Sequence, residues 1–183
     1  EACGHGLEAT SVAKGHSVFP DQVGQLVASE LVTAIDDGTR SNLWGSINID
    51  DEGSIPQKNV LIEDGILKGY MVDRLNGKRM NQPSTGSARR QSYQYPPTSR
   101  MTNTYIAAGE STKQEIIEAT DYGLYAKKMG GGSVNPATGE FNFAVMEGYI
   151  VKDGKIVKPV RGLHLIGKGI DVLKKIDKVG NNL

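Results

Sequence analysis

The sequence predicts an α+β fold, with a mainly antiparallel β sheet or barrel-like core and three or four helices. Two Asp-Gly pairs, Asp64-Gly65 and Asp153-Gly154, each stand between short apolar runs, which is typical of tight β-hairpins. Thr112, three residues before Glu115, forms a capping-box pattern that predicts a helix start. Glycine makes up 23 of 183 residues without a G-X-Y period, which excludes collagen and indicates many turns.

The first half of the chain contains three predicted elements. Apolar positions in residues 23–35 fall near helical spacing, although residues 31–33 fit a strand equally well. Turn chemistry at residues 36–38 is expected to end that element. Residues 43–50 alternate between apolar and polar and predict a strand, and residues 59–72 predict the first Asp-Gly hairpin.

The second half begins with a long loop at residues 82–99, followed by a candidate strand at 100–107. The helix that starts after Thr112 is expected to continue through Leu124, and the glycine run at residues 129–133 to end it. Three further elements are predicted after the glycine run. They are a strand at 141–146, the second Asp-Gly hairpin at 148–157, and a helix whose apolar positions run from Ile170 to Val179 before Gly180.

Composition excludes several functional classes. The 21 Lys and Arg residues balance 21 Asp and Glu residues, so the chain has no electrostatic footprint for nucleic acid or anionic lipid. No apolar run approaches the roughly 20 residues that a membrane helix requires. One cysteine cannot form an internal disulfide, which fits a reducing compartment. We therefore expect a cytoplasmic protein with neither a nucleic acid nor a membrane as partner.

The chain opens at Glu1 without a methionine, and Glu1 lies four residues before His5. On a helix the two side chains would share a face, which alone is more typical of a surface contact than of a catalytic site. If a histidine preceded Glu1, the string would be HEACGH, an HExxxH pattern. Histidines five residues apart point about 140° apart on a regular helix, so both reach one metal only if the helix bulges. Gly4 is a suitable position for that distortion.

Residues 1–9 read EACGHGLEA and resemble the metal motif HEAxGHxLE of the TldD branch of the TldD/PmbA family, known also as modulators of DNA gyrase. Other stretches match the same family in order along nearly the whole chain: residues 27–33, 36–39, 48–53, 60–63, 65–71, 100–105, 130–132, 165–169 and 179–181. The resemblance implies that residues 1–183 are a single fragment of the β-rich C-terminal catalytic domain. The N-terminal domain and the C-terminal end of that protein are then expected to be absent from this chain.

The resemblance implies a zinc-dependent peptidase that hydrolyses unfolded or flexible peptides. Carried over by residue, Glu1 is the catalytic base that takes a proton from zinc-bound water, and His5 is the second histidine ligand. The first histidine would precede Glu1, and the family's ligand cysteine would follow Leu183. Cys3 does not match that position and is expected to be a small buried side chain. We therefore expect Zn²⁺ in the full-length protein, and neither tight zinc binding nor peptide cleavage by residues 1–183 alone.

Arg100, Asn103 and Thr104 match a family segment and are candidate substrate-binding residues beside an extended peptide; a plain structural strand fits them equally well. His16 and His164 lack metal-ligand spacing and are expected to be ordinary surface or core residues. The resemblance also implies a homodimer or heterodimer with a TldD/PmbA-family subunit. The alternative function is non-enzymatic, as a partner subunit of PmbA type or a modulator of DNA gyrase. The PmbA branch lacks the metal motif that this sequence carries.

Overall fold

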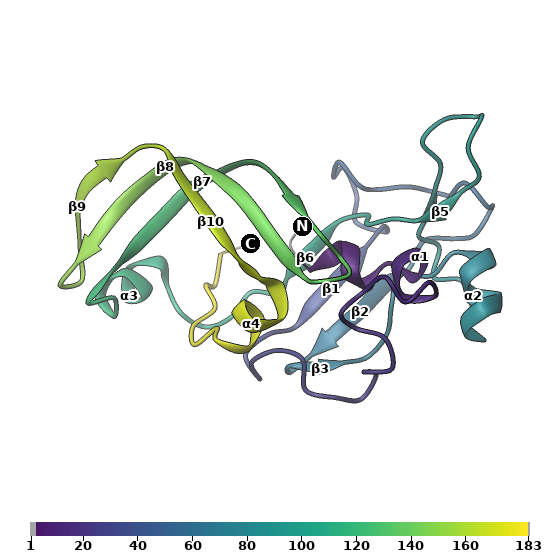
Figure 1. Ribbon diagram of the computed structural model, residues 1–183, viewed down its shortest axis with the longest axis horizontal. Coiled ribbons are helices and arrows are strands. Elements are labelled where there is room, and N and C mark those ends of the chain that lie inside the picture. Colours follow the sequence, from purple (N-terminus) through teal and green to yellow (C-terminus); the bar gives the residue numbers. More distant parts are fainter. Residues whose placement is uncertain (1–2, 183) are drawn as a thin grey trace.

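The computed structural model describes residues 3–182, which form two main sheets that lie side by side (Figure 1). These residues contain four α-helices, one 3-10 helix and ten strands, which confirms the predicted α+β class. The strands within each sheet pair antiparallel. Both main sheets are open in the described part of the chain rather than closed into a barrel.

The first sheet has the strand order β3-β2-β1-β6. Its strands are β1 (Ala34–Asp37), β2 (Lys58–Glu63), β3 (Ile66–Leu67) and β6 (Thr104–Ile106). The turn between β2 and β3 confirms the predicted Asp-Gly hairpin, because Asp64 and Gly65 both have positive φ, +49° and +78°. Two such residues in succession make the turn whose twist matches that of the flanking strands.

The second sheet, which we call the ribbon sheet, is built on two long strands, β7 (Tyr122–Val134) and β8 (Glu140–Lys152). The shorter strands β9 (Lys155–Val160) and β10 (Leu163–Lys168) pair one after the other along the opposite side of β8. Asp153 and Gly154 join β8 to β9 with φ values of +48° and +71°, as the second Asp-Gly pair predicts.

The remaining elements are short. They are the 3-10 helix η1 (Gly4–Leu7), helices α1 (Ala9–Val12), α2 (Arg74–Met80), α3 (Lys113–Glu118) and α4 (Gly169–Lys174), and the paired strands β4 (Ala88–Arg89) and β5 (Thr98–Ser99). Strands β4 and β5 lie within and at the end of the predicted long loop. Every helix within residues 3–182 is too short or too polar to cross a lipid bilayer.

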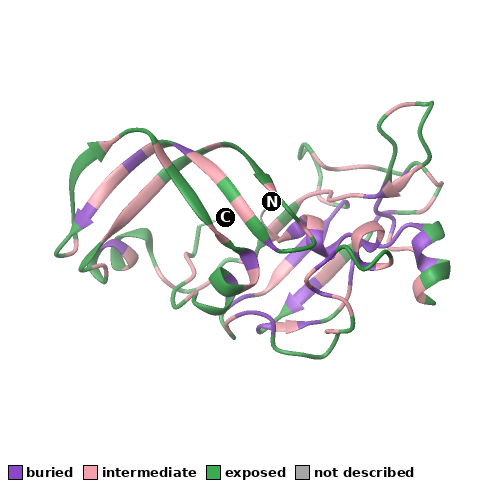
Figure 2. Ribbon diagram, in the orientation of Figure 1, coloured by how far each residue is buried: buried purple, intermediate pink, exposed green. Residues whose placement is uncertain are grey.

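The hydrophobic core lies under the first sheet and around η1 and α1, where the buried residues gather in Figure 2. Its fully buried members include Phe19, Leu61 and Met71. Helix α4 joins this core from the other end of the chain, because Leu173 packs into it and is only 8% exposed. The apolar repeat at the C-terminus therefore predicts a real helix, although that helix ends at Lys174.

Three predictions in the first half are wrong. Residues 23–33 form turns and irregular backbone rather than a helix or a strand, and Gly24 there has a φ of +85°, which no helix contains. Residues 43–50 are turns and bends rather than a strand. Asp36 and Asp37 do not form a turn, because they belong to β1 and are 0% and 6% exposed. Long-range hydrogen bonds to β2 and β6 override the local preference of these residues.

The helix after Thr112 begins as predicted. Thr112 and Glu115 form both bonds of the capping box. The helix stops at Glu118, however, and Leu124 lies in β7. The glycine run does not end a helix but continues β7, where a side chain at Gly132 would overlap the backbone of Asn142 on β8. Gly132 therefore permits close approach of two strands instead of making a turn.

Candidate functional site

His5 lies on the 3-10 helix η1, which the extended residue Glu8 separates from α1. The chain is held at this break by a bridge to Met71: the Met71 N–H donates to the Leu7 carbonyl at 2.9 Å, and the Ala9 N–H donates to the Met71 carbonyl at 2.8 Å. The described part of the motif is therefore a tight turn rather than a regular α-helix. Glu1, the candidate base, lies outside the described residues.

Gly4 begins η1 and is buried. A Cβ at this position would overlap the Sδ atom of Met101, which packs directly over the turn. Gly6 is similarly close to Phe19, whose ring would lie 3.0 Å from an added Cβ. Glycine at both positions lets the turn that carries His5 pack flush against the core.

The imidazole of His5 contacts a buried carboxylate three residues later. His5 Nδ1 lies 3.1 Å from Glu8 Oε1, and the side chains of His5 and Glu8 are 23% and 5% exposed. The other oxygen of Glu8, Oε2, lies 3.6 Å from Arg100 Nη1. Arg100 thus pairs with the residue that holds the candidate ligand, and its own side chain is 41% exposed.

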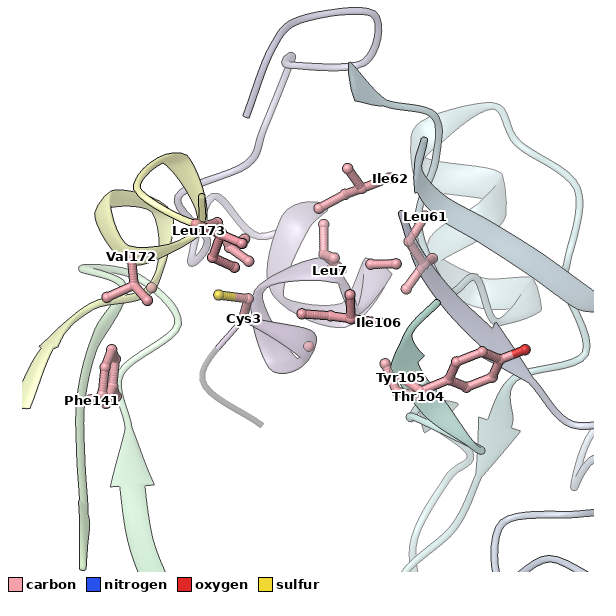
Figure 3. Close-up of a pocket in the computed structure, with 14 residues that line it drawn as sticks. Cys3, Leu7, Leu61, Ile62, Thr104, Tyr105, Ile106, Phe141, Val172 and Leu173 are labelled. Atoms are coloured by element: carbon pink, nitrogen blue, oxygen red, sulfur yellow. The ribbon is translucent and has the colours of Figure 1, made fainter. Parts of the chain in front are cut away.

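An apolar cavity of about 340 Å³ opens beside the η1 turn (Figure 3). It lies between η1, strand β6, strand β8 and helix α4. The residues that line it are Cys3, Gly4, Leu7, Ala34, Leu61, Ile62, Thr104, Tyr105, Ile106, Phe141, Gly169, Val172, Leu173 and Ile176. The cavity therefore brings the first sheet, the motif turn and the ribbon sheet together around one space.

Cys3 lines this cavity, with its sulfur directed toward α4 (Figure 3). Burial raises the pKa of the Cys3 thiol to about 11, so the thiol is protonated at neutral pH. This partly buried position agrees with a packing role.

Two other candidate residues follow Arg100 and are bound to the protein itself. Asn103 donates through Nδ2 to the Asp37 carbonyl at 2.8 Å and accepts from the Gly45 N–H at 2.9 Å. It therefore connects the end of β1 and the loop that follows to the start of β6. Thr104 donates its hydroxyl to Asp36 Oδ1 at 2.6 Å and also borders the cavity. The structure brings Thr104 to the cavity wall, whereas the Asn103 amide faces the loop.

Sequence reasoning missed two buried carboxylates near these residues. Asp36 is fully buried and accepts hydrogen bonds from the Thr102 N–H, the Thr102 hydroxyl and the Thr104 hydroxyl. Burial raises the pKa of Asp36, and these donors oppose the rise. Nothing local in the sequence distinguishes Asp36 from a turn residue, because its donors lie more than 60 residues away.

Asp73 is the second. It caps α2 by accepting from the Asn76 N–H at 3.2 Å, and it accepts from the Ser99 hydroxyl at 2.8 Å. Ser99 Oγ in turn lies 2.8 Å from the hydroxyl of Thr10 on α1. This network joins α1, α2 and β5 directly beside Arg100. Asp is a common N-cap residue, so the sequence could have indicated a helix start at Asp73, but nothing in the local sequence indicates that Asp73 is buried.

Within residues 3–182, no group of three or more His, Cys, Asp and Glu side chains converges as a metal site. His5 offers one potential metal ligand, and its Nδ1 contacts the Glu8 carboxylate. Histidine ligands in metal centres usually contact a carboxylate in this way through their second ring nitrogen. His164 instead lies on β10 and contacts Asn142 Oδ1 at 2.8 Å on the surface of the ribbon sheet. His16 follows α1 and is exposed. The donor chemistry at His5 therefore fits zinc as one ligand of a larger set.

Comparisons with curated proteins give relatives with metalloprotease names. The chain is 51% identical over 183 residues to a metalloprotease TldD homolog of Buchnera aphidicola from Acyrthosiphon pisum, covering 100% of this chain and 38% of that protein. It is 48% identical over 181 residues to the TldD homolog of Haemophilus influenzae, covering 99% and 38%. A zinc metalloprotease TldD homolog of Saccharolobus solfataricus is 37% identical over 133 residues, covering 73% and 30%. The chain thus spans about two fifths or less of the length of these relatives.

Two solved structures share the fold. TldE from Thermococcus kodakarensis has a TM-score of 0.84 at 25% identity, over 97% of this chain and 40% of that one. A Thermotoga maritima protein named for modulation of a DNA gyrase has a TM-score of 0.82 at 24% identity, over 96% and 40%, which shows the fold alone. The family described as PmbA/TldA metallopeptidase C-terminal domain matches residues 1–183. Since this match extends over the entire chain, the chain belongs to that family.

Proposed function

We propose that this chain carries part of the catalytic centre of a zinc-dependent peptidase of TldD type, with His5 as a zinc ligand and Glu1 as the base. The observation that carries the proposal is the position of His5 on the turn η1, where its Nδ1 lies 3.1 Å from the buried Glu8 carboxylate and its neighbours Gly4 and Leu7 line the apolar cavity. The metalloprotease names of the relatives support the same chemistry. Three protein ligands are usual for a catalytic zinc, so the other two come from outside the described residues.

A bound zinc ion supplies Lewis acidity and lowers the pKa of water to about 7. In the proposed mechanism the carboxylate of Glu1 takes up the proton that the attacking water loses, and can return it to the leaving amine. His5 contributes a neutral imidazole as ligand. The buried packing of Gly4 under Met101 fixes the turn, and with it the direction of the imidazole.

The proposed substrate is an unfolded or flexible peptide that lies along β6. Strand β6 is the last of the first sheet, and its outer edge pairs with no other strand within residues 3–182. An extended peptide can pair with such an edge through its backbone, while the apolar cavity receives a side chain. We propose that Thr104 touches the peptide, Asn103 holds the loop behind it, and Arg100 acts through Glu8.

A TldD/PmbA-family subunit, identical or different, is the proposed partner, and the TldE likeness supports this choice. Because His5 is one ligand of three, we propose that residues 1–183 alone neither retain zinc nor cleave peptides. The activity therefore has to be measured on the protein as its gene encodes it, together with any family subunit of the same organism. We call this preparation the encoded protein.

The test compares Glu1→Gln with the unsubstituted encoded protein, using an unstructured peptide and measuring bound zinc beside hydrolysis. The expected result is retained zinc and loss of hydrolysis by at least about 100-fold, because general-base catalysis contributes on that order. Glu30→Gln, at an exposed glutamate, serves as the control with unchanged hydrolysis. Unchanged hydrolysis in Glu1→Gln would refute the mechanism. A metal-free, inactive unsubstituted protein would favour the non-enzymatic partner subunit.

A further inference from the structure

We propose that Glu8 is a positioning residue for the metal centre, which holds His5 through Nδ1 so that zinc is met by Nε2, with Arg100 as its counter-ion. The inference rests on the proposed role of His5 as a zinc ligand. It goes beyond that role by assigning the residues that orient the His5 imidazole, Glu8 directly and Arg100 through Glu8. The distance of 3.1 Å between His5 Nδ1 and Glu8 Oε1 is a hydrogen-bond distance.

The carboxylate of Glu8 is fixed from several sides. Its backbone is flanked by the two hydrogen bonds to Met71, and its carbonyl accepts from the Ser11 and Val12 N–H groups as the N-cap of α1. Its side chain is 5% exposed, and its two oxygens face different partners, Oε1 toward His5 and Oε2 toward Arg100. Because both oxygens are directed, rotation of the carboxyl group would break one contact or the other.

Arg100 is itself held in place. Its backbone N–H donates to the Ser87 carbonyl at 2.8 Å. The preceding residue, Ser99, is buried and bonded to Asp73 and to Thr10 on α1. The Asp73 network thus holds the end of β5, and Arg100 follows it directly. A buried carboxylate needs such a positive partner to remain ionised at low cost.

An ionised carboxylate is only an acceptor, so the shared proton resides on Nδ1 and the lone pair of the neutral imidazole is on Nε2. Histidine ligands of metal sites commonly donate their second nitrogen to a carboxylate in this way, which sets the tautomer and the ring orientation. Loss of such a partner lowers metal affinity by about 10-fold to 100-fold. Glu8 is such a partner, three residues after the proposed ligand.

The first experiment measures zinc affinity of the encoded protein by competition with a chelator. Glu8→Gln keeps the size of the side chain but removes its charge, and we expect the zinc Kd to rise by about 10-fold to 100-fold. Arg100→Gln is expected to raise it by less than about 10-fold, because the ion pair is partly exposed to solvent. Asp50→Asn is the matched control: Asp50 is also a buried carboxylate, but it accepts from Ser54 and Ala88, and its Kd is expected to stay within about 2-fold.

The second experiment begins with the unsubstituted protein, so its first result does not depend on the folding of a variant. A ¹⁵N–¹H correlation spectrum of the imidazole groups, recorded on the zinc-free encoded protein at about pH 8, reads which nitrogen of His5 carries the proton. The proposal expects the Nδ1–H tautomer, and a shift toward Nε2–H in Glu8→Gln. A purely structural role of Glu8 would change stability without changing the tautomer.

The outcomes separate this inference from the proposed function. If His5→Ala leaves zinc binding unchanged, the proposed function fails. If His5→Ala abolishes zinc binding, but Glu8→Gln stays within about 2-fold of the unsubstituted protein or His5 carries its proton on Nε2, then the zinc site stands and the role of Glu8 is refuted.

Discussion

The region around the motif turn, within residues 3–99, differs from the ribbon sheet in the side chains that it buries. All buried polar side chains among the described residues lie before residue 100, and they include the carboxylates Glu8, Asp36, Asp50 and Asp73. The ribbon sheet, residues 122–168, contributes only Val145 and Val151 to the buried apolar set. Most of its ribbon is exposed or intermediate in burial (Figure 2). Its exposed large apolar residues include Ile166 and Met146, which are 74% and 66% exposed.

This difference shows where precise geometry is maintained. A buried carboxylate costs free energy unless donors satisfy its oxygens. No described buried side-chain nitrogen or oxygen lacks a hydrogen-bond partner, so the motif region meets that requirement. Its polar groups fix the directions of side chains, including those of Glu8 and Arg100. The ribbon sheet depends instead on strand register and hairpin turns, which tolerate more change at the surface.

The largest expected effect tests the buried network. Asp73→Ala removes the acceptor of Asn76 and Ser99 and leaves these donors buried, so we expect a loss of about 3–5 kcal/mol in the free energy of unfolding. Urea unfolding of the encoded protein measures it. Glu140→Ala, at an exposed carboxylate of the ribbon sheet, should cost less than about 0.5 kcal/mol. Equal losses in the two variants would break the contrast between the regions.

A smaller effect tests whether the ribbon sheet is tolerant throughout. Gly132→Ala would force a methyl group onto the Asn142 backbone, and we expect a loss of about 1–3 kcal/mol. Gly131 is the matched control, because an added Cβ there meets no atom within 4 Å. Gly131→Ala should be neutral or stabilise by up to about 1 kcal/mol. Thermal melting of both variants measures the difference, and identical melting temperatures would show that strand packing at Gly132 is not tight.

The buried Asp36 predicts a pH dependence opposite in sign to that of Glu147 on the ribbon sheet, whose pKa is lowered by hydrogen bonds from Lys127 and Tyr149. Because burial raises the pKa of Asp36, the folded protein binds the Asp36 proton more tightly than the unfolded chain. The free energy of unfolding should therefore fall as pH rises from about 3.9 to the folded pKa, by about 1.4 kcal/mol per pH unit. Asp36→Asn should lack this fall. Urea unfolding at stepped pH measures it, and parallel curves for the two proteins would contradict the prediction.

The smallest effect concerns the outer face of the ribbon sheet. Ile166→Thr and Met146→Ser replace exposed side chains and should each change the free energy of unfolding by less than about 0.5 kcal/mol. Leu61→Ala, in the buried core, should cost about 2–5 kcal/mol. Denaturant titrations compare the three. A loss above about 1.5 kcal/mol at Ile166 would mean that this face packs against something in solution.

Local chemistry made some elements predictable. Asp64-Gly65 and Asp153-Gly154 determine their turns because few other residue pairs accept positive φ at both positions. Thr112 and Glu115 likewise satisfy each other within one helical turn. Each of these predictions depends on residues close in the chain, and each is confirmed.

The failures depend on contacts between distant residues. Residues 23–33 have helical spacing, yet hydrogen bonds to β3 and α4 hold them as irregular backbone, for example from Ser29 to Leu173. The glycine run in β7 was interpreted as the end of a helix. The packing of Gly132 against Asn142 depends on β8, which the local sequence of β7 does not reveal. For the candidate site, the motif led to His5, but the contact from Glu8 to Arg100 joins residues 92 positions apart and was visible only in three dimensions.

The most direct test of the whole account is the zinc affinity of the encoded protein carrying His5→Ala, measured by chelator competition. His164→Ala, a change at the exposed histidine of the ribbon sheet, is the comparison. We predict that His5→Ala weakens zinc binding by more than about 100-fold, because it removes a ligand rather than a supporting contact, while His164→Ala leaves it unchanged. Zinc binding that survives His5→Ala at full affinity would contradict the account.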